Sequence, residues 1–438
     1  MNIRTRNNIF YALCAVFVTA GAFVVFYAQG WRFDLEPFGF NKVGGIYLRS
    51  FPDDAAIFIN GKYVDKKPGL LNRGRFINNL FPKNYKLTLK SGGYYDWTEN
   101  IQVSPSLVSE LKYVVLIPKN YETAYEGLVK NFYAANGQLI INTGNSLVYG
   151  GKKIKGGKLI WQDSASKIVL TENISSKTYF INYLSENTAT STNLNEKIAL
   201  YGINPANIRE IIKDHGTSGG SIIRTAASIF SLNISTGEIS KLTSSSSTIS
   251  KIAVSPSWIA WINYNSVNGK SLLTFYNRAS GEMTVKTAIA GQAVKIDFRN
   301  NDELGILQND GNFYIASSEN NQPGKTAEGV RDFEFSPKGN LVSLLENETL
   351  EIFAFNGDKD YWRFRLPEAQ KIERVEWHAD ENHLFVIYPE ETKFLGLEDK
   401  SIENFAVVAD GKQAHYDADS NTFYFIKDGE LRKLQFAK

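Results

Sequence analysis

The sequence predicts an all-β protein with one N-terminal transmembrane helix, in which a small β-sandwich precedes a β-propeller of about seven or eight blades. Three observations support this fold class. Twenty consecutive uncharged residues, Ile9 to Ala28, stand near the start of the chain. The remainder is rich in turn-forming and aromatic residues, with 34 Gly, 28 Phe and 22 Tyr against two Met. A strand pattern then recurs with a period of about 40 residues.

The apolar run is long enough to cross a bilayer, because a helix rising about 1.5 Å per residue covers a hydrocarbon core of about 30 Å in some twenty residues. Arg4 and Arg6 precede the run, whereas the far flank has only Arg32 beside acidic residues. The positive-inside bias therefore predicts a single-pass protein of the cell membrane, with a cytoplasmic N-terminus and the bulk of the chain outside.

A cleaved signal peptide is the alternative, since Ala20-Gly21-Ala22 has the small-x-small form of a cleavage site. Cleavage there would leave a bare apolar N-terminus beginning at Phe23, and the full length of the run suits a retained anchor better. Cys14 lies inside the run and is the one cysteine of the chain, so no disulfide holds the part outside the membrane.

Charge and turn composition divide the chain further. The net charge is +2, but residues 41–118 have a basic balance and the residues beyond them an acidic one, which indicates a boundary near Pro118. Two interpretations of the basic module stay open: a solvated surface without a partner, and a surface that contacts anionic head groups or wall polymers. The predicted parts are a cytoplasmic tail at 1–8, a transmembrane helix at 9–29, a linker at 30–43, a β-sandwich at 44–118 and a propeller at 119–438.

Strand and turn signals define the sandwich. Asn60-Gly61 is the pair that a two-residue type I′ hairpin requires, because both positions need a positive φ. Residues Tyr85 to Lys90 alternate strictly, which places Tyr85, Leu87 and Leu89 on one face. Further strands are predicted at Gly45 to Ser50 and Leu111 to Leu116.

The order of these segments resembles a PEGA domain over about 75 residues of the chain. The resemblance implies a small extracytoplasmic β module attached to envelope and surface proteins, and it carries over no catalytic residue. Two positions depart from the family pattern, since Lys67-Pro68-Gly69-Leu70 shares only Pro and Gly with the name-giving motif and Lys83 stands in place of a turn glycine. The matching segments are Ala56 to Ile59 with Asn60-Gly61-Lys62, Leu80 to Tyr85, and Gly93-Tyr94.

The rest of the chain repeats a unit of four short strands, which is the signature of a propeller. A shorter unit at Asn131 to Gly157 precedes these copies, and the last unit, Ala414 to Phe436, shows only three strands. We expect a strand near Tyr125 to Lys130 to complete the last unit and fasten the ring. Asn204 to Asp214 fits a helix or a turn leading into a strand. The predicted first strands centre near Trp161, Ile212, Ala253, Asp297, Glu334, Glu376 and His415.

One turn of the repeat, Phe335-Ser336-Pro337-Lys338-Gly339-Asn340, resembles the corresponding turn of WD-repeat and TolB-type propellers. Proline fixes φ there, and glycine takes a positive-φ position. Ser255-Pro256 matches the same turn in part. The resemblance implies a propeller fold and no particular activity.

Candidate chemical motifs are weak. Gly216-Thr217-Ser218-Gly219-Gly220 beside His215 fits the pattern of a hydrolase nucleophile elbow, but it falls between two predicted strands instead of a strand and a helix. Asp417, Asp419 and Asn421 have the spacing of a calcium loop, although Thr422 replaces its glycine.

Histidine and tryptophan give two further patterns. His378 and His383 could meet a metal, but their turn is polar and we expect solvated side chains. Tryptophans suggest either a carbohydrate platform or, as we expect for most of them, core packing between blades. They are Trp161, Trp258, Trp261, Trp362 and Trp377.

The sequence therefore predicts a membrane-anchored binding or scaffold protein of the bacterial cell envelope, without enzymatic activity. We assign no catalytic, cofactor-binding or metal-binding residue and expect no cofactor. The expected partner is an envelope protein or a cell-wall polymer; a phosphate-binding glycine loop and a dense basic face are absent from the sequence, which argues against nucleotides and nucleic acid.

Two alternatives remain open. An envelope hydrolase of glycosidase or peptidase type would use carboxylates on the propeller loops, and two carboxylates about 5 to 10 Å apart in a central pocket would favour it. A polymer-binding adhesin would expose coplanar aromatic side chains on one face of the propeller.

Overall fold

The computed structural model describes residues 3–35, 38–65, 74–144, 146–163, 165–185, 189–355, 361–397 and 405–437. The chain forms two compact units. The first extends to Asn120 and includes short C-terminal segments, and the second comprises Tyr121–Leu397 and Ala406–Gln435. Among the described residues most of the regular structure is β, with one long helix at the N-terminus.

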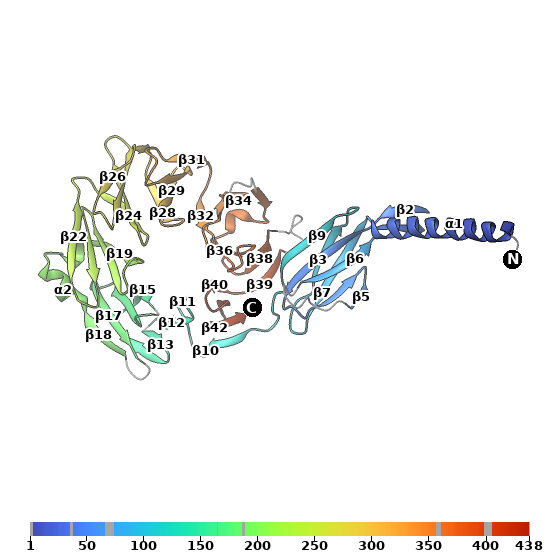
Figure 1. The fold of residues 1–438 in the computed structure, drawn as a ribbon. Coiled ribbons are helices and arrows are strands. Elements are labelled where there is room, and N and C mark those ends of the chain that lie inside the picture. The colour runs from blue at the N-terminus through green and yellow to red at the C-terminus, as the bar shows by residue number, and fades with distance from the viewer. Residues whose placement is uncertain are drawn as a thin grey trace. The chain divides into compact units, whose positions relative to one another are not determined.

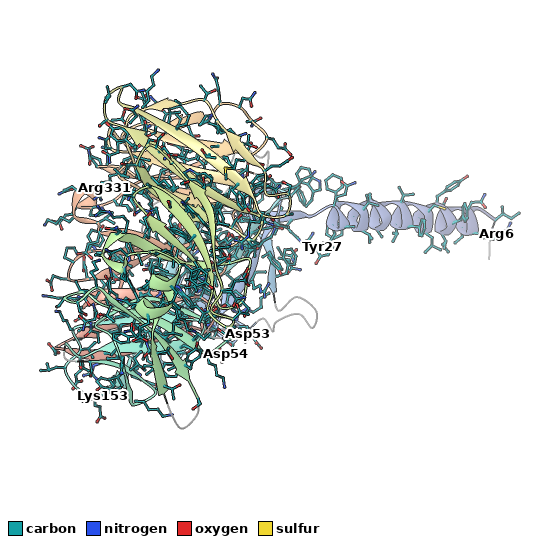
Figure 2. All side chains as sticks on the ribbon, turned by 90° about the vertical axis from the view of Figure 1, so that its left-hand side faces the viewer. Arg6, Tyr27, Asp53, Asp54, Lys153 and Arg331 are labelled. Atoms are coloured by element: carbon teal, nitrogen blue, oxygen red, sulfur yellow. The ribbon has the colours of Figure 1, made fainter. Side chains whose placement is uncertain are left out.

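The N-terminal helix α1 (Ile3–Ala28) contains a segment, Thr5–Ala28, that is long and apolar enough to span a membrane. Its side chains from Thr5 onward are exposed and point outward between the labelled Arg6 and Tyr27 (Figure 2). Gly30 follows with φ +84, and the Arg32 guanidinium donates 2.7 Å to the Tyr27 carbonyl. This contact satisfies a carbonyl at the helix C-terminus, where a positive charge is favourable.

The rest of the first unit is built from two β-sheets that share one core. Buried side chains of both sheets, such as Leu48 and Leu87, belong to this core and have no exposed surface. One sheet has the order β6-β3-β9, with β3 and β9 parallel, and the other has the order β5-β4-β7-β8, while β1 and β2 form a separate hairpin. The strands are β1 (Trp31–Leu35), β2 (Phe38–Lys42), β3 (Gly44–Phe51), β4 (Ala56–Ile59), β5 (Lys62–Val64), β6 (Arg75–Leu80), β7 (Asn84–Lys90), β8 (Trp97–Gln102) and β9 (Val108–Val115).

The predicted local features of this unit are confirmed. Ile59 pairs with Lys62, and the two residues between them, Asn60 and Gly61, have φ values of 49° and 78°. In β7 the buried residues are Tyr85, Leu87 and Leu89, as strict alternation requires. The segment Lys67-Pro68-Gly69-Leu70 lies outside the described residues.

The second unit contains eight antiparallel sheets in its described part, and each has four strands that follow one another in sequence except where noted below. The sheets succeed one another along the chain (Figure 1). The first four are β11 (Asn131–Ala135), β12 (Gln138–Asn142), β13 (Leu147–Tyr149), β14 (Lys152–Ile154); β15 (Lys158–Asp163), β16 (Ile168–Asn173), β17 (Thr178–Leu184), β18 (Ala189–Asn193); β19 (Ile208–Asp214), β20 (Gly220–Thr225), β21 (Ser228–Asn233), β22 (Ile239–Ser244); and β23 (Ile249–Val254), β24 (Trp258–Asn265), β25 (Lys270–Asn277), β26 (Met283–Val285), with β27 (Ile289–Ala290) added to β25.

The other four sheets have the same plan. The last of them includes one strand from the start of the unit, because β10 pairs with β42. The strands are β28 (Ala293–Phe298), β29 (Glu303–Gln308), β30 (Phe313–Ser317), β31 (Gly324–Ala327); β32 (Asp332–Phe335), β33 (Leu341–Leu345), β34 (Thr349–Ala354), β35 (Tyr361–Arg365); β36 (Arg374–Trp377), β37 (His383–Ile387), β38 (Thr392–Gly396), β39 (Ala406–Ala409); and β40 (Lys412–Asp417), β41 (Thr422–Lys427), β42 (Glu430–Gln435), β10 (Glu122–Tyr125).

Two predictions about this repeat are confirmed. Each predicted strand centre lies on the first strand of a sheet, and the missing strand of the last sheet comes from the N-terminal side, although it lies at Glu122–Tyr125 and not at Tyr125 to Lys130 as predicted. The first strands of neighbouring sheets contact one another in series, and β40 contacts β11. The His415 Nε2 atom lies 2.8 Å from the Ala134 carbonyl oxygen at this junction, so the series returns to its starting sheet.

The segment from Asn204 is resolved as a turn leading into a strand. Asn204 caps a short 3-10 helix, η1 (Pro205–Asn207), and β19 follows directly. A short helix that was not predicted, α2 (Leu194–Leu200), lies just before it, and the side chain of its N-cap residue Asn193 accepts a hydrogen bond from the Asn195 amide. A second 3-10 helix, η2 (Ala369–Lys371), precedes β36.

Candidate active site on neighbouring first strands

Four consecutive first strands carry a titratable residue at the same position, between apolar neighbours. These residues are Asp297 on β28, Glu334 on β32, Glu376 on β36 and His415 on β40. Because side chains alternate along a strand, each points away from the core that its neighbours fill. The apolar neighbours of Glu334, for example, are buried phenylalanines.

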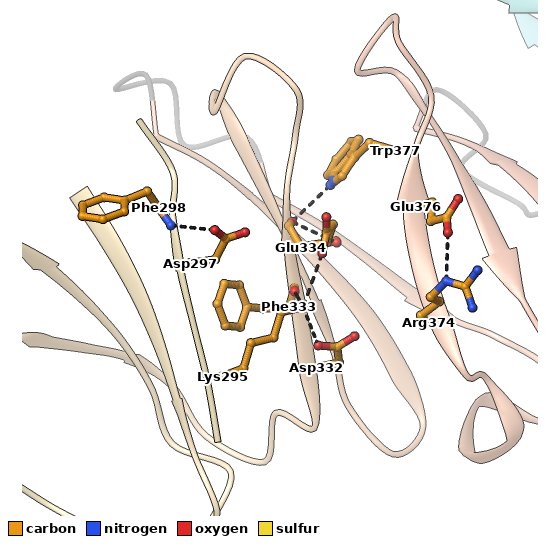
Figure 3. Close-up of polar contacts among 10 residues, drawn as sticks. Lys295, Asp297, Phe298, Asp332, Phe333, Glu334, Arg374, Glu376 and Trp377 are labelled. Carbon is orange, nitrogen blue, oxygen red and sulfur yellow. Dashed lines mark hydrogen bonds and ion pairs between the residues drawn. The ribbon is translucent and has the colours of Figure 1, made fainter. Parts of the chain in front are cut away.

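Lys295 connects two of these strands. Its ammonium group donates 2.8 Å to Asp332 Oδ1, 2.6 Å to the Phe333 carbonyl and 3.3 Å to Glu334 Oε2. Asp297 lies two residues after Lys295 on β28, and its carboxylate points toward Glu334 (Figure 3). The site therefore brings three carboxylates around one lysine, across the junction of two sheets.

The pKa values of this group are shifted in the way an acid–base site requires. Burial raises the pKa of the Glu334 carboxyl to about 7, with Asp297 and Asp332 adding to the shift and Lys295 opposing it. Burial also raises the pKa of the Asp297 carboxyl, although the Phe298 amide and Lys295 oppose the rise. Burial would lower the pKa of Lys295, but the negative charges of Glu334 and Asp332 outweigh it and raise the value.

The site remains open to water. The side chain of Glu334 is 44% exposed and that of Lys295 34%. These side chains are accessible and yet partly dehydrated by the surrounding protein, so a ligand can reach them. A separate cavity of about 460 Å³ lies beside β19–β22, near Asn204 and Lys241, and none of these carboxylates lines it.

The next carboxylate of the series, Glu376, has a different environment. Its Oε1 accepts from Arg374 Nε at 2.8 Å and lies 3.1 Å from His415 Nδ1, and its Oε2 accepts 2.8 Å from the Tyr416 amide. Burial alone would raise the pKa of Glu376, but these partners lower it, and Glu376 in turn raises the pKa of His415 against the effect of burial. This group joins the last sheets and does not offer a protonated carboxyl.

The structure places the proposed nucleophile motif in a hairpin. Residues Gly216 to Gly220 connect β19 to β20, two antiparallel strands, so the segment is not the strand-to-helix turn of a hydrolase elbow. Ser218 is exposed in this turn. His215 interacts electrostatically with Asp297, and burial together with Lys213 lowers its pKa.

The expectation that His378 and His383 are solvated is wrong. They are 6% and 7% exposed, and each Nδ1 atom lies near one oxygen of Asp380, at 3.0 and 2.8 Å. The rings are covered by Tyr416 and Phe394, which stack on them. These aromatic residues belong to other strands, so the polar sequence of the turn did not reveal its burial.

The calcium-like spacing serves other contacts. The Asp417 side chain is buried and accepts hydrogen bonds from the Gly137 amide at 2.8 Å and from Ser420 Oγ at 2.7 Å. Asp419 is exposed, whereas Asn421 is buried and accepts from Tyr416. These residues fasten β40 to its neighbours.

The tryptophans lie mostly in the core, as expected. Trp161, Trp261 and Trp377 are at most 7% exposed, while Trp258 and Trp362 are partly exposed. Trp377 has a role beside the site, because its indole N–H donates 3.1 Å to the Glu334 carbonyl.

Sequence reasoning missed Lys295, Asp297 and Glu334 as site residues. A signal was present: in three consecutive repeats an acidic residue interrupts an apolar first strand at the same position, as in Phe333-Glu334-Phe335. Such a residue cannot serve the core, so its recurrence points to a shared polar surface.

No protein-family model and no curated protein matches the sequence. Among solved structures, the chain is similar to an oligogalacturonate lyase from Vibrio parahaemolyticus, with 10% identity and a TM-score of 0.49, over 72% of this chain and 96% of that one. It is also similar to an oligogalacturonate lyase in complex with manganese, with 10% identity and a TM-score of 0.48, over 73% and 99% of the two chains.

The prediction of a binding or scaffold protein without enzymatic activity is corrected by the site itself, in which two carboxyls have raised pKa values and three residues of metal-ligand type lie together. Both similar structures are enzymes, and the described residues include a His378, Asp380 and His383 group able to hold a metal ion. The similarity is too distant to assign a substrate or a reaction to this chain.

Proposed function

We propose that this protein is an enzyme that cleaves glycosidic bonds in a polysaccharide, with Asp297 and Glu334 as its acid–base pair. The observation that carries the proposal is the pair of carboxyls on the first strands of neighbouring sheets, bridged by Lys295 between Asp332 and Glu334, with raised pKa values, one of them about 7. Two carboxyl groups in unequal environments are the machinery of most glycoside hydrolases. The carboxylates stand on first strands, where the envelope-hydrolase hypothesis had placed them on loops.

The electrostatics assign a role to each carboxyl. Glu334, with a pKa of about 7, keeps its proton in a substantial fraction of molecules at neutral pH and acts as the general acid toward the leaving oxygen. The negative charge of Asp297 contributes to this high pKa, so Asp297 is the ionised partner and acts as the base or nucleophile. Lys295 holds Asp332 and Glu334 in place and limits the rise of the Glu334 pKa.

The fold supports access to this site. We propose that the eight sheets are the blades of a β-propeller whose first strands surround a common axis, because neighbouring first strands contact one another and β40 returns to β11. The titratable series Asp297, Glu334, Glu376 and His415 would then line one side of the central channel. A chain-like substrate reaches such a channel from its open end.

The proposal places the enzyme at the cell surface. The helix Thr5–Ala28 would anchor it with the N-terminus in the cytoplasm, as the flanking arginines favour. The two-sheet module of the first unit would be a PEGA-like domain, and the second unit would act outside the membrane on a cell-wall polymer. This arrangement is supported by the sequence resemblance and the hairpin at Asn60-Gly61.

The test uses the full chain in detergent and a panel of polysaccharides that includes peptidoglycan glycan strands and oligogalacturonate. Release of reducing ends measures cleavage, and ultraviolet absorbance of an unsaturated product separates elimination from hydrolysis. Cleavage should fall at least about 100-fold in Glu334→Gln and in Asp297→Asn, the loss typical of a missing acid or base. The matched control is Glu348→Gln, since Glu348 is 78% exposed and its ion-pair partner is Arg365, which does not belong to the site.

Two outcomes would overturn the proposal. Absence of cleavage across the panel by the folded protein would remove the assigned activity. Full activity in both Glu334→Gln and Asp297→Asn would show that these carboxyls do not carry it. An unsaturated product would keep the acid–base pair but change the reaction from hydrolysis to elimination.

A further inference from the structure

A buried group of metal-ligand type lies in the turn between β36 and β37. His378 and His383 flank the turn, and Asp380 stands between them. Their donor atoms all lie within 4.8 Å of one another. The two Nδ1 atoms approach different oxygens of the same carboxylate, His378 at 3.0 Å and His383 at 2.8 Å.

The backbone holds this turn in one shape. The His378 amide donates 2.9 Å to the His383 carbonyl, and the Glu381 amide donates 3.1 Å to the His378 carbonyl. The Asp380 Oδ1 atom also accepts 2.9 Å from the Asn382 amide, which orients the carboxylate toward the histidines. Three donors are therefore placed together before any ion binds.

Aromatic rings fix the imidazoles from outside the turn. The His383 ring stacks on Phe394 with centroids 4.8 Å apart and planes 5° apart, and the His378 ring stacks on Tyr416 at 5.1 Å and 27°. Asp380 is 16% exposed, more than either histidine, so solvent reaches the group on the carboxylate side. A water molecule can complete the coordination from that side.

The donor set selects the ion. Two imidazole nitrogens and one carboxylate oxygen suit zinc and similar transition metals, whereas calcium and magnesium prefer oxygen donors alone. Zinc bonds to nitrogen and oxygen of about 2.0 to 2.2 Å require donors a little farther apart than hydrogen-bond contact, so zinc binding would separate the three donor atoms slightly. The single carboxylate supplies part of the compensating charge.

We propose that His378, Asp380 and His383 form a zinc site that fixes the end of β36. Trp377, the residue before His378, donates its indole N–H to the Glu334 carbonyl at 3.1 Å. Zinc bound in the turn would therefore hold the strand end that contacts β32. This inference does not depend on the polysaccharide substrate, since it concerns metal binding and stability.

The experiment uses the full-length protein in detergent, stripped of metal by a chelator and then dialysed. Titration calorimetry with zinc should find one site, and zinc should raise the temperature of thermal unfolding. Cobalt added in place of zinc should give the intense visible absorption of a four-coordinate ion. The variant His383→Gln should weaken zinc binding at least about 10-fold, in line with loss of a metal contact.

His215→Gln is the matched control and should bind zinc as the wild type does, because His215 lies in another turn. If His383→Gln does not fold, the wild-type cobalt spectrum decides alone. A six-coordinate aqua spectrum, or zinc binding unchanged in His383→Gln, would overturn the inference and leave Asp380 as a hydrogen-bond partner of two histidines. Failure of the glycosidase test would not affect either result.

Discussion

Replacing Lys295 by methionine tests the electrostatic basis of the acid–base pair. Lys295 Nζ lies 3.3 Å from Glu334 Oε2, and the two side chains are 34% and 44% exposed. Because both side chains are only partly exposed, the dielectric constant of water sets the lower limit of the attraction, and Coulomb's law then gives about 1.3 kcal/mol at this distance. That energy corresponds to about one pKa unit.

The expected result is an upward shift of the Glu334 pKa. Burial, its largest cause, stays in place, and loss of the lysine removes the charge that opposes it, so the pKa moves from about 7 to about 8. In the proposed reaction Glu334 acts as the protonated acid, so the alkaline limb of the pH profile of kcat/KM should move upward by the same amount. A limb that stays in place, or moves to lower pH, would refute the electrostatic reasoning.

The same shift can be measured without a substrate. A carboxyl with a folded-state pKa above its unfolded value binds protons more tightly when folded, so it lowers the free energy of unfolding as pH rises from about 4.5 toward 7. In Lys295→Met this loss should extend to about pH 8. Lys371→Met is the control, because Lys371 pairs with Glu368 at 2.8 Å on an exposed surface and should leave the profile unchanged between about pH 5 and pH 8.

Three further predictions concern stability and topology. Arg278→Ala should lower the free energy of unfolding by about 3 to 5 kcal/mol, because it leaves the Asp214 carboxylate, which is 1% exposed, without its paired guanidinium. The control Arg365→Ala removes an arginine that is 84% exposed and should change this free energy little. Thermal unfolding followed by tryptophan fluorescence compares the two variants. Gly305→Ala should cost about 1 to 3 kcal/mol in the same assay because its Cβ would lie 2.8 Å from two phenylalanine rings, whereas Gly157→Ala meets only an atom at 3.9 Å and should be tolerated. Protease added to intact cells should degrade the second unit and spare α1; protection of the second unit until lysis would reverse the proposed orientation.

The repeat could be predicted from the sequence because its signals are local. Alternation, turn residues and a period of about 40 residues mark each sheet without knowledge of its neighbours. Asn60-Gly61 fixes its hairpin through the φ values of those two residues alone. The short helix α2 was missed because seven residues cannot display a sustained helical period.

The candidate site depends on contacts between repeats, and these have no local signal. Lys295 and Glu334 are 39 residues apart, close to one period, so each belongs to a different sheet. His378 is buried because Tyr416 of the next sheet lies on it, although its own turn is polar in sequence. Only the packing of one sheet against the next determines which polar residues are enclosed together.

Glu334 and Glu376 show how neighbours decide the role of an equivalent position. Both stand at the same place on consecutive first strands, and burial acts to raise the pKa of both. Glu376 receives Arg374, His415 and a backbone amide, which lower its pKa and keep it ionised as an anchor between sheets. Glu334 receives one lysine that it shares with Asp332, while Asp297 repels its charge, so its proton is retained to about pH 7. The carboxyl of Glu334 therefore keeps its proton because this repeat supplies too few cations for its carboxylates. An added cation near Glu334 should lower its pKa and leave it ionised at neutral pH without altering the fold.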